Sequence, residues 1–418
     1  MASLLIRGGR GLTGVVDVEG NKNAALPLLA ACLLTDQPCT LRNVPRIGDV
    51  QVMVDLLRDL GAEVQSLDGT TLRVTCADVK TDTPDPRLVG RLRGSVLLLG
   101  PLLARRGRAA LAQPGGDFPA RRTMAVHLSA LAALGARPVA GDVPVLELDS
   151  RLRPASIYLD EASVTGTETA LLAAAAAEGL TEIRHAACEP HVVELARFLR
   201  QMGAAVSGEG SPTIRIEGVA RRRGVSHHLE GDYIEAGTWA VVSAVTRGDV
   251  EVRGARREHL EVVTNVLRRF EVDFALDEDR LRVRPSRLAG GGRVTTGVWP
   301  GFPSDLVSLV TVLATQADGD TLLHDWMYEL RLFALDQLSG MGAQLFLCDP
   351  HRIIVTGHRR LRARVLDGRD LRSGMALVAA ALAADGESRV GPLETIQRGY
   401  GKVQERLASL GADVTRVE

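Results

Sequence analysis

Leu60-Gly61-Ala62 is the first of six related tripeptides spread along the chain. The later copies are Leu134-Gly135-Ala136, Met202-Gly203-Ala204, Met341-Gly342-Ala343 and Leu410-Gly411-Ala412, with a degenerate copy, Phe270-Glu271-Val272, where the spacing requires one. The period is roughly 70 residues, which is longer than the usual units of solenoid proteins. Six copies in register indicate one α/β unit repeated six times.

The sequence around each copy has the same order of elements. Residues 50–60 have apolar side chains three and four positions apart, which predicts a helix, and Gly61 suits a left-handed helix end. Residues 63–66 and 71–74 alternate between apolar and polar side chains, which predicts two strands. An Ala- and Leu-rich helix at 171–177 likewise precedes a β segment. We therefore expect six βα-type units.

Six such units imply two pseudo-symmetric lobes of three units each. Helices such as 375–384 are apolar nearly all round, which indicates that they are buried. The expected fold is therefore α/β, a two-lobed inside-out barrel with sheets around buried helices. We expect the first lobe at 22–229, with a mobile loop at 113–123, and the second at 1–21 plus 230–418. A ligand site is expected in the cleft between the lobes.

The composition argues against several classes of protein. The 418 residues include 50 basic and 51 acidic ones, a net charge of −1, so nothing favours nucleic acid or a membrane surface as a partner. Aromatic residues make up 3%, too few for base-stacking platforms. No run of residues has the length and apolarity of a membrane span. We expect a soluble, cytoplasmic monomer.

The sequence also lacks the motifs of the common cofactors. The five cysteines are scattered without a Cys-x-x-Cys pair, which is typical of reduced thiols and not of a disulfide framework or a zinc site. Walker and Rossmann glycine motifs do not occur. The chemistry is therefore expected to use no cofactor and no metal.

The segment Gly20 to Pro27, which contains Lys22 and Asn23, precedes an apolar run at 28–34 that predicts a helix. A cation and amides before a helix N-terminus suit an anion, because the first-turn N–H groups are free. The alternative is an ordinary capped helix start.

Two further loops each carry an acid. Gln113 to Asp117 has two glycines, which allow close approach to a ligand, and Arg121 and Arg122 follow. An acid beside arginines suits proton transfer near a bound anion, although such a loop can also be a solvated surface turn. Gly301 to Asp305 leads into an expected helix, where Ser304 and Asp305 can alternatively be N-cap residues.

Three dispersed arginines complete the set of candidate residues. Arg331, Arg372 and Arg398 lie near expected strand-to-helix junctions. The guanidinium group binds carboxylate and phosphate through two parallel hydrogen bonds. Taken singly, each of these arginines has the alternative of a plain surface charge.

Together these segments resemble the enolpyruvyl transferases, a family that includes 5-enolpyruvylshikimate-3-phosphate synthase. The resemblance covers the chain from Ile6 to Ala412. Its strongest pieces are Gly20 to Pro27, Thr40 to Pro45, Pro114-Gly115-Gly116, Phe302 to Asp305 and Asp370-Leu371-Arg372. The segment Asn21-Lys22-Asn23-Ala24 is similar to the branch of the family that uses UDP-N-acetylglucosamine. The family fold consists of two inverted α/β lobes of three units each.

The resemblance implies transfer of the enolpyruvyl group of phosphoenolpyruvate to the 3-hydroxyl of UDP-N-acetylglucosamine, the first committed step of peptidoglycan synthesis. The implied catalytic residues are Asp117 as the acid, Asp305 as the base, Lys22 and Arg398. The implied substrate-binding residues are Lys22, Asn23, Arg93, Arg122, Ser163, Val164, Asp305, Met327, Arg331, Arg372 and Arg398. Neither a metal nor a cofactor is implied.

The chain departs from the family pattern at several positions. Asp117 stands where most members have the cysteine that fosfomycin alkylates, so the enzyme is expected to be insensitive to fosfomycin. The loop from Arg122 to His127 lacks the family's proline and aspartate. Glu161 replaces a lysine and Tyr233 replaces an arginine. These changes affect the half of the site that the family uses for the nucleotide sugar.

Two other functions therefore stay open at this stage. The chain can be an enolpyruvyl transferase with another hydroxyl acceptor, such as a UMP-like nucleotide in specialised metabolism. It can also be a non-catalytic regulatory paralogue. The retained Lys22, Asp305 and arginines argue against the paralogue.

Overall fold

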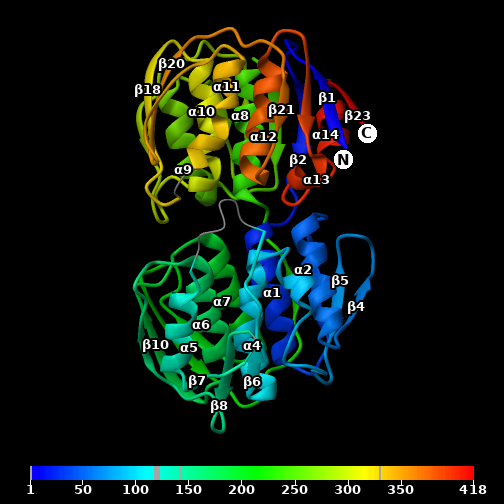
Figure 1. Cartoon of the computed structure of the whole chain (residues 1–418), viewed down its shortest axis with the longest axis vertical. Coiled ribbons are helices and arrows are strands. Elements are labelled where there is room, and N and C mark those ends of the chain that lie inside the picture. Colours follow the sequence, from blue (N-terminus) through cyan, green and yellow to red (C-terminus); the bar gives the residue numbers. More distant parts are fainter. Residues whose placement is uncertain (1, 117–122, 142, 329–330) are drawn as a thin grey trace. The chain divides into compact units, whose positions relative to one another are not determined.

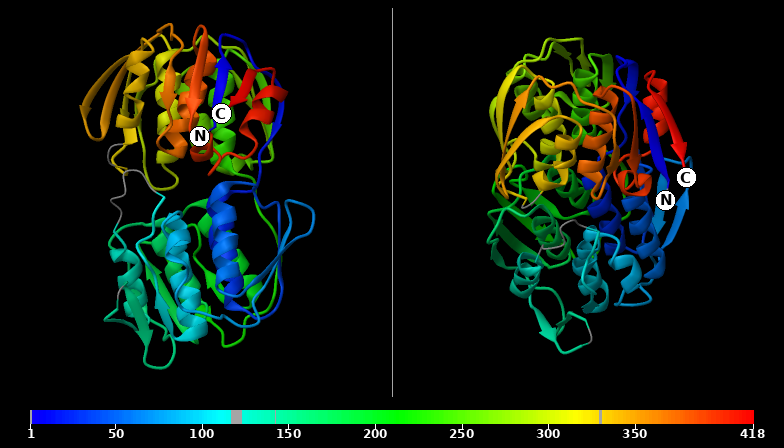
Figure 2. Two further views of the ribbon diagram at one scale, coloured as in Figure 1. Left: turned by 45° about the vertical axis from the view of Figure 1, so that its right-hand side comes forward. Right: turned by 45° about the horizontal axis from the view of Figure 1, so that its top comes forward.

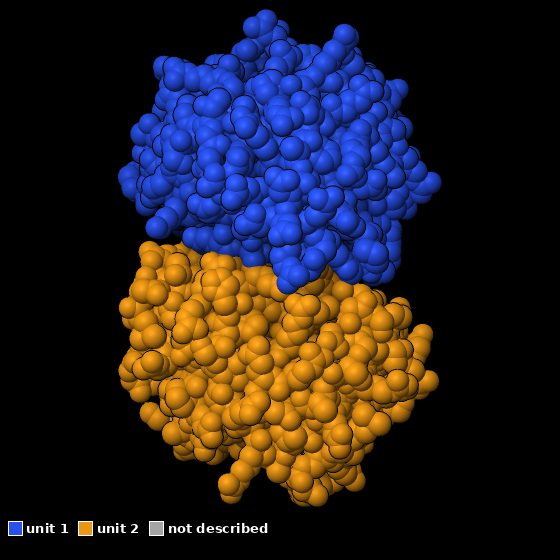
Figure 3. Space-filling model, turned by 180° about the vertical axis from the view of Figure 1, so that it is seen from behind, with its two compact units in different colours: residues 1–19, 231–418 blue, residues 20–230 orange. Residues whose placement is uncertain are grey.

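The structure is a computed structural model that describes residues 2–116, 123–141, 143–328 and 331–418. The chain forms two compact units. Unit 1 consists of residues 1–19 and 231–418, and unit 2 consists of residues 20–230 (Figure 3). The chain passes between the units twice, at 19–20 and at 230–231.

Unit 2 contains three sheets. The first has the order β13 (Ser226–His228), β3 (Cys39–Arg42), β5 (Leu72–Thr75), β4 (Glu63–Ser66); the second β6 (Arg108–Ala110), β8 (Val145–Leu148), β7 (Ala136–Val139); the third β11 (Ala205–Ser207), β12 (Thr213–Gly218), β10 (Gly179–Arg184), β9 (Ser156–Tyr158). Its α-helices are α1 (Lys22–Ala31), α2 (Gly48–Asp59), α3 (Pro86–Val89), α4 (Leu99–Arg106), α5 (Ala125–Ala133), α6 (Val164–Ala174) and α7 (Pro190–Met202).

Unit 1 also contains three sheets. Their orders are β21 (Val365–Asp367), β22 (Glu387–Gly391), β1 (Ser3–Arg7), β23 (Asp413–Val417); β15 (Phe274–Leu276), β16 (Arg280–Val283), β14 (Asp249–Arg253), β2 (Thr13–Asp17); and β17 (Gly292–Thr295), β18 (Gly319–His324), β20 (Arg352–Gly357), β19 (Gln344–Asp349). Its α-helices are α8 (Tyr233–Val245), α9 (Arg257–Arg269), α10 (Val307–Thr315), α11 (Gln337–Gly340), α12 (Leu371–Ala383), α13 (Leu393–Ile396) and α14 (Val403–Ser409).

The six sheets show the repeat directly. Five of them consist of one parallel strand pair that two antiparallel strands extend, and the sixth, β6-β8-β7, is antiparallel over the residues described. Figure 1 shows the helices α8, α10 and α12 of unit 1 side by side with strands around them, and the further views in Figure 2 agree. Every residue of α8 and of α10 is buried. The expected inside-out α/β arrangement is therefore confirmed.

The middle residue of each tripeptide ends a helix in the left-handed conformation. The φ angles are 101° at Gly61, 102° at Gly135, 116° at Gly203, 55° at Glu271, 99° at Gly342 and 88° at Gly411. Five copies have glycine, which adopts this conformation at little cost. Glu271 adopts it too, so the degenerate sixth copy has the same structural role.

The sequence predicts a helix at 28–34, and the predicted start of this helix is wrong. In the structure α1 begins at Lys22, and residues 32–34 form a 3-10 turn. The Asn21 side chain caps α1 by accepting hydrogen bonds from the N–H groups of Asn23 (2.8 Å) and Ala24 (3.2 Å). Pro27 lies inside the helix, where proline is rarely tolerated, and the segment therefore resembles a loop in the sequence.

At each crossing, the first residue of the unit that the chain enters is a glycine, Gly20 or Gly231, which packs against a backbone carbonyl of that same unit. An added Cβ atom would lie 1.8 Å from the Asn43 oxygen at Gly20, and 2.0 Å from the Gly254 oxygen at Gly231. Any side chain at these positions would therefore displace backbone. The residue after each glycine, Asn21 or Asp232, caps the next helix.

Across the ranges that the structure describes, no helix combines the length and the apolar character that a membrane crossing requires.

Candidate active site

The N-terminal ends of three buried helices in unit 1 meet at a cluster of charged side chains. Helices α8, α10 and α12 pack against one another. Asp232 and Asp370 cap α8 and α12, and the 3-10 turn Ser304–Leu306 leads into α10. Helix N-termini favour anions, because their first N–H groups have no partner within the helix.

Asp305 lies between two arginines that come from separate elements. Arg372, in the first turn of α12, donates its Nη2–H to Oδ2 of Asp305 at 2.7 Å, and Arg331 donates its Nη1–H to Oδ1 at 3.3 Å. The side chains of Arg331 and Arg372 are only 8% and 5% exposed. Burial by itself would lower the pKa of both guanidinium groups, but Asp305 beside them raises it above the usual value. Both groups are therefore permanent cations beside one carboxylate.

Hydrogen bonds that involve a tyrosine and a threonine fix the side chain of Arg372. Arg372 donates its Nη1–H to the Tyr400 hydroxyl at 3.1 Å, and that hydroxyl lies 3.0 Å from the hydroxyl of Thr238 on α8. Burial raises the pKa of Tyr400, so its hydroxyl stays neutral. Arg398 is half-buried two residues before Tyr400, in the segment between α13 and α14.

A buried aspartate holds the loop that carries Asp305. The Asp325 carboxylate accepts hydrogen bonds from the hydroxyls of Thr296 (2.8 Å) and Ser304 (2.7 Å). The Ser304 hydroxyl in turn accepts from Arg331 Nη1 at 2.7 Å. The N-cap alternative for this pair is therefore wrong, because neither the 3-10 turn nor α10 has a side-chain cap. Asp325 was missed in the sequence, where it belongs to no motif.

Met327 is an exposed residue between Asp325 and Arg331 in the sequence. Its side chain is 38% exposed, and it follows Asp325 by two residues. The next residue, Tyr328, has its ring 4.0 Å from the guanidinium carbon of Arg331, a cation–π contact. Unit 1 thus brings Asp305, Arg331 and Arg372 into direct contact. In sequence, Met327 lies two residues after Asp325, and Arg398 lies two residues before Tyr400.

Unit 2 presents a second, smaller cluster at the start of α1. Lys22 is the first residue of this helix, and its Nζ lies 2.7 Å from Oδ2 of Asp49, at the start of α2. The two side chains are 11% and 4% exposed. Asn23 follows and is half-buried. The segment is thus both a capped helix start and the position of a buried lysine at a helix N-terminus.

The other candidate residues of unit 2 lie at helix starts as well. Arg93 is buried and donates its Nη2–H to the carbonyl of Thr123 at 2.8 Å. Ser163 caps α6 by accepting from the N–H of Gly166 at 3.2 Å, and Val164 is the first residue of that helix.

Some of the departures from the family pattern also lie at helix starts. His127 is buried, and its Nε2 lies 2.9 Å from the Thr165 hydroxyl, which links the altered loop to α6. Tyr233 is buried, and its ring meets the rings of Trp299 (5.5 Å) and His259 (6.1 Å) edge to face. Glu161 is exposed.

Asp117 and Arg122 lie outside the described residues, as does most of the loop predicted to be mobile. The chain just before them is closely packed. The N–H of Gly115 donates to the Val89 carbonyl at 3.1 Å, and a Cβ at Gly115 would lie 2.0 Å from the oxygen of Gly90. A glycine is therefore required there for a steric reason within unit 2.

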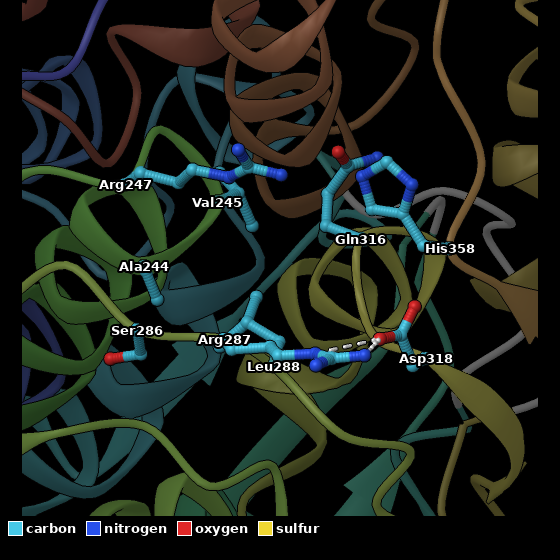
Figure 4. Close-up of a pocket in the computed structure, with 9 residues that line it drawn as sticks. All are labelled: Ala244, Val245, Arg247, Ser286, Arg287, Leu288, Gln316, Asp318 and His358. Carbon is cyan, nitrogen blue, oxygen red and sulfur yellow. Dashed lines mark hydrogen bonds and ion pairs between the residues drawn. The ribbon is translucent and has the colours of Figure 1, made fainter.

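A pocket of about 380 Å³ lies in unit 1 at the C-terminal ends of two of these helices, α8 and α10. Ala244 and Val245 end α8, and Gln316 follows α10. Figure 4 shows these lining residues together with Arg287, which reaches toward Asp318, 3.2 Å away. Asp305 precedes α10 and the pocket follows it, and a helix of nine residues is about 14 Å long, so the pocket is separate from Asp305. None of the expected site residues in the described part of the chain lines it.

Throughout the described ranges, no three or more His, Cys, Asp and Glu side chains are grouped so that they could hold a metal ion.

Comparisons with known proteins identify the family. Residues 6–407 match the family described as EPSP synthase (3-phosphoshikimate 1-carboxyvinyltransferase). The chain belongs to this family of enolpyruvyl transferases. It is 42% identical to the UDP-N-acetylglucosamine 1-carboxyvinyltransferase of Bradyrhizobium diazoefficiens, over 99% of this chain and 97% of the relative. Relatives of the same name from Treponema denticola and Borreliella burgdorferi are 40% and 38% identical, over 99% and 100% of both chains.

Solved structures of enolpyruvyl transferases share the fold. The enolpyruvyl transferase NikO from Streptomyces tendae has a TM-score of 0.90 at 25% identity, over 100% of this chain and 99% of NikO. An EPSP synthase from Acinetobacter baumannii has a TM-score of 0.78 at 17% identity, over 100% of both chains. The expected fold class and family are therefore confirmed.

Proposed function

We propose that this enolpyruvyl transferase moves the enolpyruvyl group of phosphoenolpyruvate to the 3-hydroxyl of UDP-N-acetylglucosamine and releases phosphate. The observation that carries the proposal is the identity of 38–42% over nearly the full chain to relatives with the corresponding name. The cluster of Asp305 with two buried arginines supports it, because the reaction needs a base beside fixed cations.

The reaction needs proton transfers and charge stabilisation. An acid protonates the methylene carbon of phosphoenolpyruvate, the acceptor oxygen adds to the neighbouring carbon, and a base takes the hydroxyl proton. Loss of a proton from the new methyl group then expels phosphate and leaves the enol ether. We assign the acid to Asp117 and the base to Asp305. Lys22, Arg122 and Arg398 are assigned to the charges of phosphoenolpyruvate.

The assignment of the remaining residues follows from the family positions that they match. Arg331 and Arg372 are assigned to the phosphate and carboxylate groups, and Asn23 to phosphoenolpyruvate. Arg93, Ser163, Val164 and Met327 are assigned to the acceptor. Helix N-termini at these positions add a favourable field for anions.

The ion pairs of Asp305 have a consequence for the order of events. While both arginines donate to Asp305, its oxygen atoms are occupied. A bound phosphate or carboxylate competes for the same guanidinium groups and thereby leaves Asp305 able to accept the hydroxyl proton. In this proposal, binding of the first substrate activates the base.

The biological setting is part of the same proposal. We place the reaction at the first committed step of peptidoglycan synthesis, in the cytoplasm, with the chain acting as a monomer. Asp117 in the position of the alkylated cysteine supports insensitivity to fosfomycin.

Phosphate release from phosphoenolpyruvate with three candidate acceptors tests the substrate. UDP-N-acetylglucosamine, UMP and shikimate 3-phosphate are compared at equal concentration with saturating phosphoenolpyruvate. We expect release with the nucleotide sugar at least tenfold faster than with the others. Faster release with UMP would overturn the proposed acceptor but keep the enolpyruvyl transfer.

A further inference from the structure

Trp326 is a large apolar side chain that is both exposed and fixed. Its side chain is 52% exposed, whereas Trp239 is 1% exposed. Its Nε1–H nevertheless donates to the carbonyl of Thr296 at 2.8 Å. The polar edge of the indole is therefore satisfied by the protein, and an apolar face is left toward solvent.

The indole belongs to the framework that holds the base. The Thr296 carbonyl accepts from Trp326, and the Thr296 hydroxyl donates to the neighbouring Asp325 at 2.8 Å. Asp325 also accepts from Ser304, which precedes Asp305. Asp325 is fully buried, so this chain of hydrogen bonds is rigid. The ring of Trp326 is therefore fixed by hydrogen bonds that lead through Thr296 and Asp325 to Ser304, the residue before Asp305.

The exposed apolar surface continues beyond the indole. The Met327 side chain is 38% exposed and lies next in the chain. Tyr328, by contrast, is covered by the guanidinium group of Arg331. Two exposed apolar residues thus follow one another directly after Asp325, which holds the loop of Asp305. Ligand sites commonly combine such apolar side chains with a few polar groups for orientation.

We propose that Trp326 is a specificity-determining residue that receives the apolar face of the acceptor's amino sugar. The inference rests on the proposed function, because the reacting 3-hydroxyl belongs to the pyranose ring and must reach Asp305. The part of the acceptor that lies next to Asp305 is then the sugar with its C–H groups and acetyl methyl group. These groups gain free energy when they leave water for the indole face. A bare nucleotide has no such group in that position.

Steady-state kinetics of Trp326→Ala test the role in specificity. We expect the KM for UDP-N-acetylglucosamine to rise about tenfold or more, since the burial of one aromatic contact corresponds to at least that factor. The KM for phosphoenolpyruvate should change less than twofold. Trp326→Phe, which keeps a ring but loses the Thr296 hydrogen bond, should recover most of the affinity. Equal changes in both KM values, or no change in either, would overturn the proposal.

Phe346→Ala is the matched control for loss of an exposed aromatic side chain. Phe346 is 65% exposed on β19 in the same unit. Its replacement should leave both KM values unchanged. Thermal unfolding of all three variants shows whether the fold is kept, and Trp326→Phe keeps the test valid if Trp326→Ala unfolds.

Acrylamide quenching of tryptophan fluorescence tests the contact without turnover. The chain has three tryptophans, and Trp326 has the most exposed side chain of the three. UDP-N-acetylglucosamine should reduce quenching in the wild type but not in Trp326→Phe, and UMP should not reduce it. Equal protection by UMP would overturn the role of the sugar. Protection without turnover would instead overturn the proposed function and keep the contact.

Discussion

Arg372 Nη2 and Asp305 Oδ2 lie 2.7 Å apart, in an ion pair that joins the first turn of α12 to the turn before α10. The arginine side chain is 5% exposed and the aspartate 28%. A second arginine, Arg331, lies on the other carboxylate oxygen. The carboxylate assigned as the base is thus held by the cations that we assign to the substrate.

Asp305→Asn should lower kcat about 10²- to 10⁴-fold, the usual contribution of a general base. The amide keeps the size of the side chain but cannot take the hydroxyl proton. The KM for phosphoenolpyruvate should not rise, because Arg331 and Arg372 remain and lose a competing carboxylate. Phosphate release measures both values, and a loss of less than threefold in kcat would remove Asp305 from the role of base.

A double-mutant cycle tests the Lys22–Asp49 pair. Lys22→Met leaves the Asp49 carboxylate buried without its cation, so we expect the free energy of unfolding to fall by about 3–5 kcal/mol. Adding Asp49→Asn should restore part of that loss, and the coupling is read by chemical denaturation. Independent effects of the two substitutions would show that the 2.7 Å contact contributes little to stability.

Glu235 predicts a pH dependence of stability. Burial raises its pKa to about 7 from the ordinary 4.5, although Arg406 opposes the shift. Because the folded state binds this proton more tightly than the unfolded state, the contribution is complete below about pH 4.5 and is lost as the pH rises through about 7. Relative to Glu235→Gln, the wild type should therefore lose about 3 kcal/mol between pH 4.5 and 7.5.

Chemical denaturation at five pH values measures this difference. Glu405→Gln is the matched control, because Glu405 is an exposed carboxyl on α14, next to Arg406. The control should follow the wild type. Parallel curves for the wild type and Glu235→Gln would contradict the raised pKa.

The substitution Asp117→Cys should make the enzyme sensitive to fosfomycin. Fosfomycin alkylates a thiolate, and the wild type has a carboxyl group at this position. We expect no time-dependent inactivation of the wild type, and inactivation of the variant with an adduct at residue 117 by mass spectrometry. An adduct at residue 117 of the wild type would reject the proposal.

The chain-crossing glycines predict a steric effect. Gly20→Ala should lower the free energy of unfolding by more than about 2 kcal/mol, because its Cβ would lie 1.8 Å from the Asn43 oxygen. Gly340→Ala is the control, since Gly340 lies in α11 with no heavy atom within 4 Å of an added Cβ. That change should be neutral or stabilising by up to about 1 kcal/mol. Equal effects at the two positions would contradict the steric account.

The repeat is the part of the fold that the sequence predicts best. A helix that ends in the left-handed conformation usually has glycine at that position. A regular series of glycines such as Gly61 therefore predicts where the helices end, and Glu271 has the same conformation in the copy without glycine. The start of α1 was not predictable, because Pro27 resembles a helix boundary and only the Asn21 cap shows otherwise. The Asn21 cap is local, but a local pattern cannot reveal that packing against distant segments keeps a proline inside a helix.

The site was predictable only where its residues belong to motifs. Asp305, Arg331 and Arg372 were expected and lie together. Asp325, Tyr400 and Asp49 act through contacts between segments distant in sequence, and a single sequence holds no signal for such contacts. Trp326 likewise stands out only when its exposure and its hydrogen bond to Thr296 are both known.

Product analysis by mass spectrometry and NMR tests the central claim most directly. The wild-type chain is incubated with phosphoenolpyruvate and UDP-N-acetylglucosamine, with Asp305→Asn as the parallel control. The account predicts a product with an enolpyruvyl ether at the 3-oxygen of the sugar, one phosphate released for each product molecule, and at most a trace with the variant. An unmodified nucleotide sugar from an enzyme that still binds phosphoenolpyruvate would contradict it.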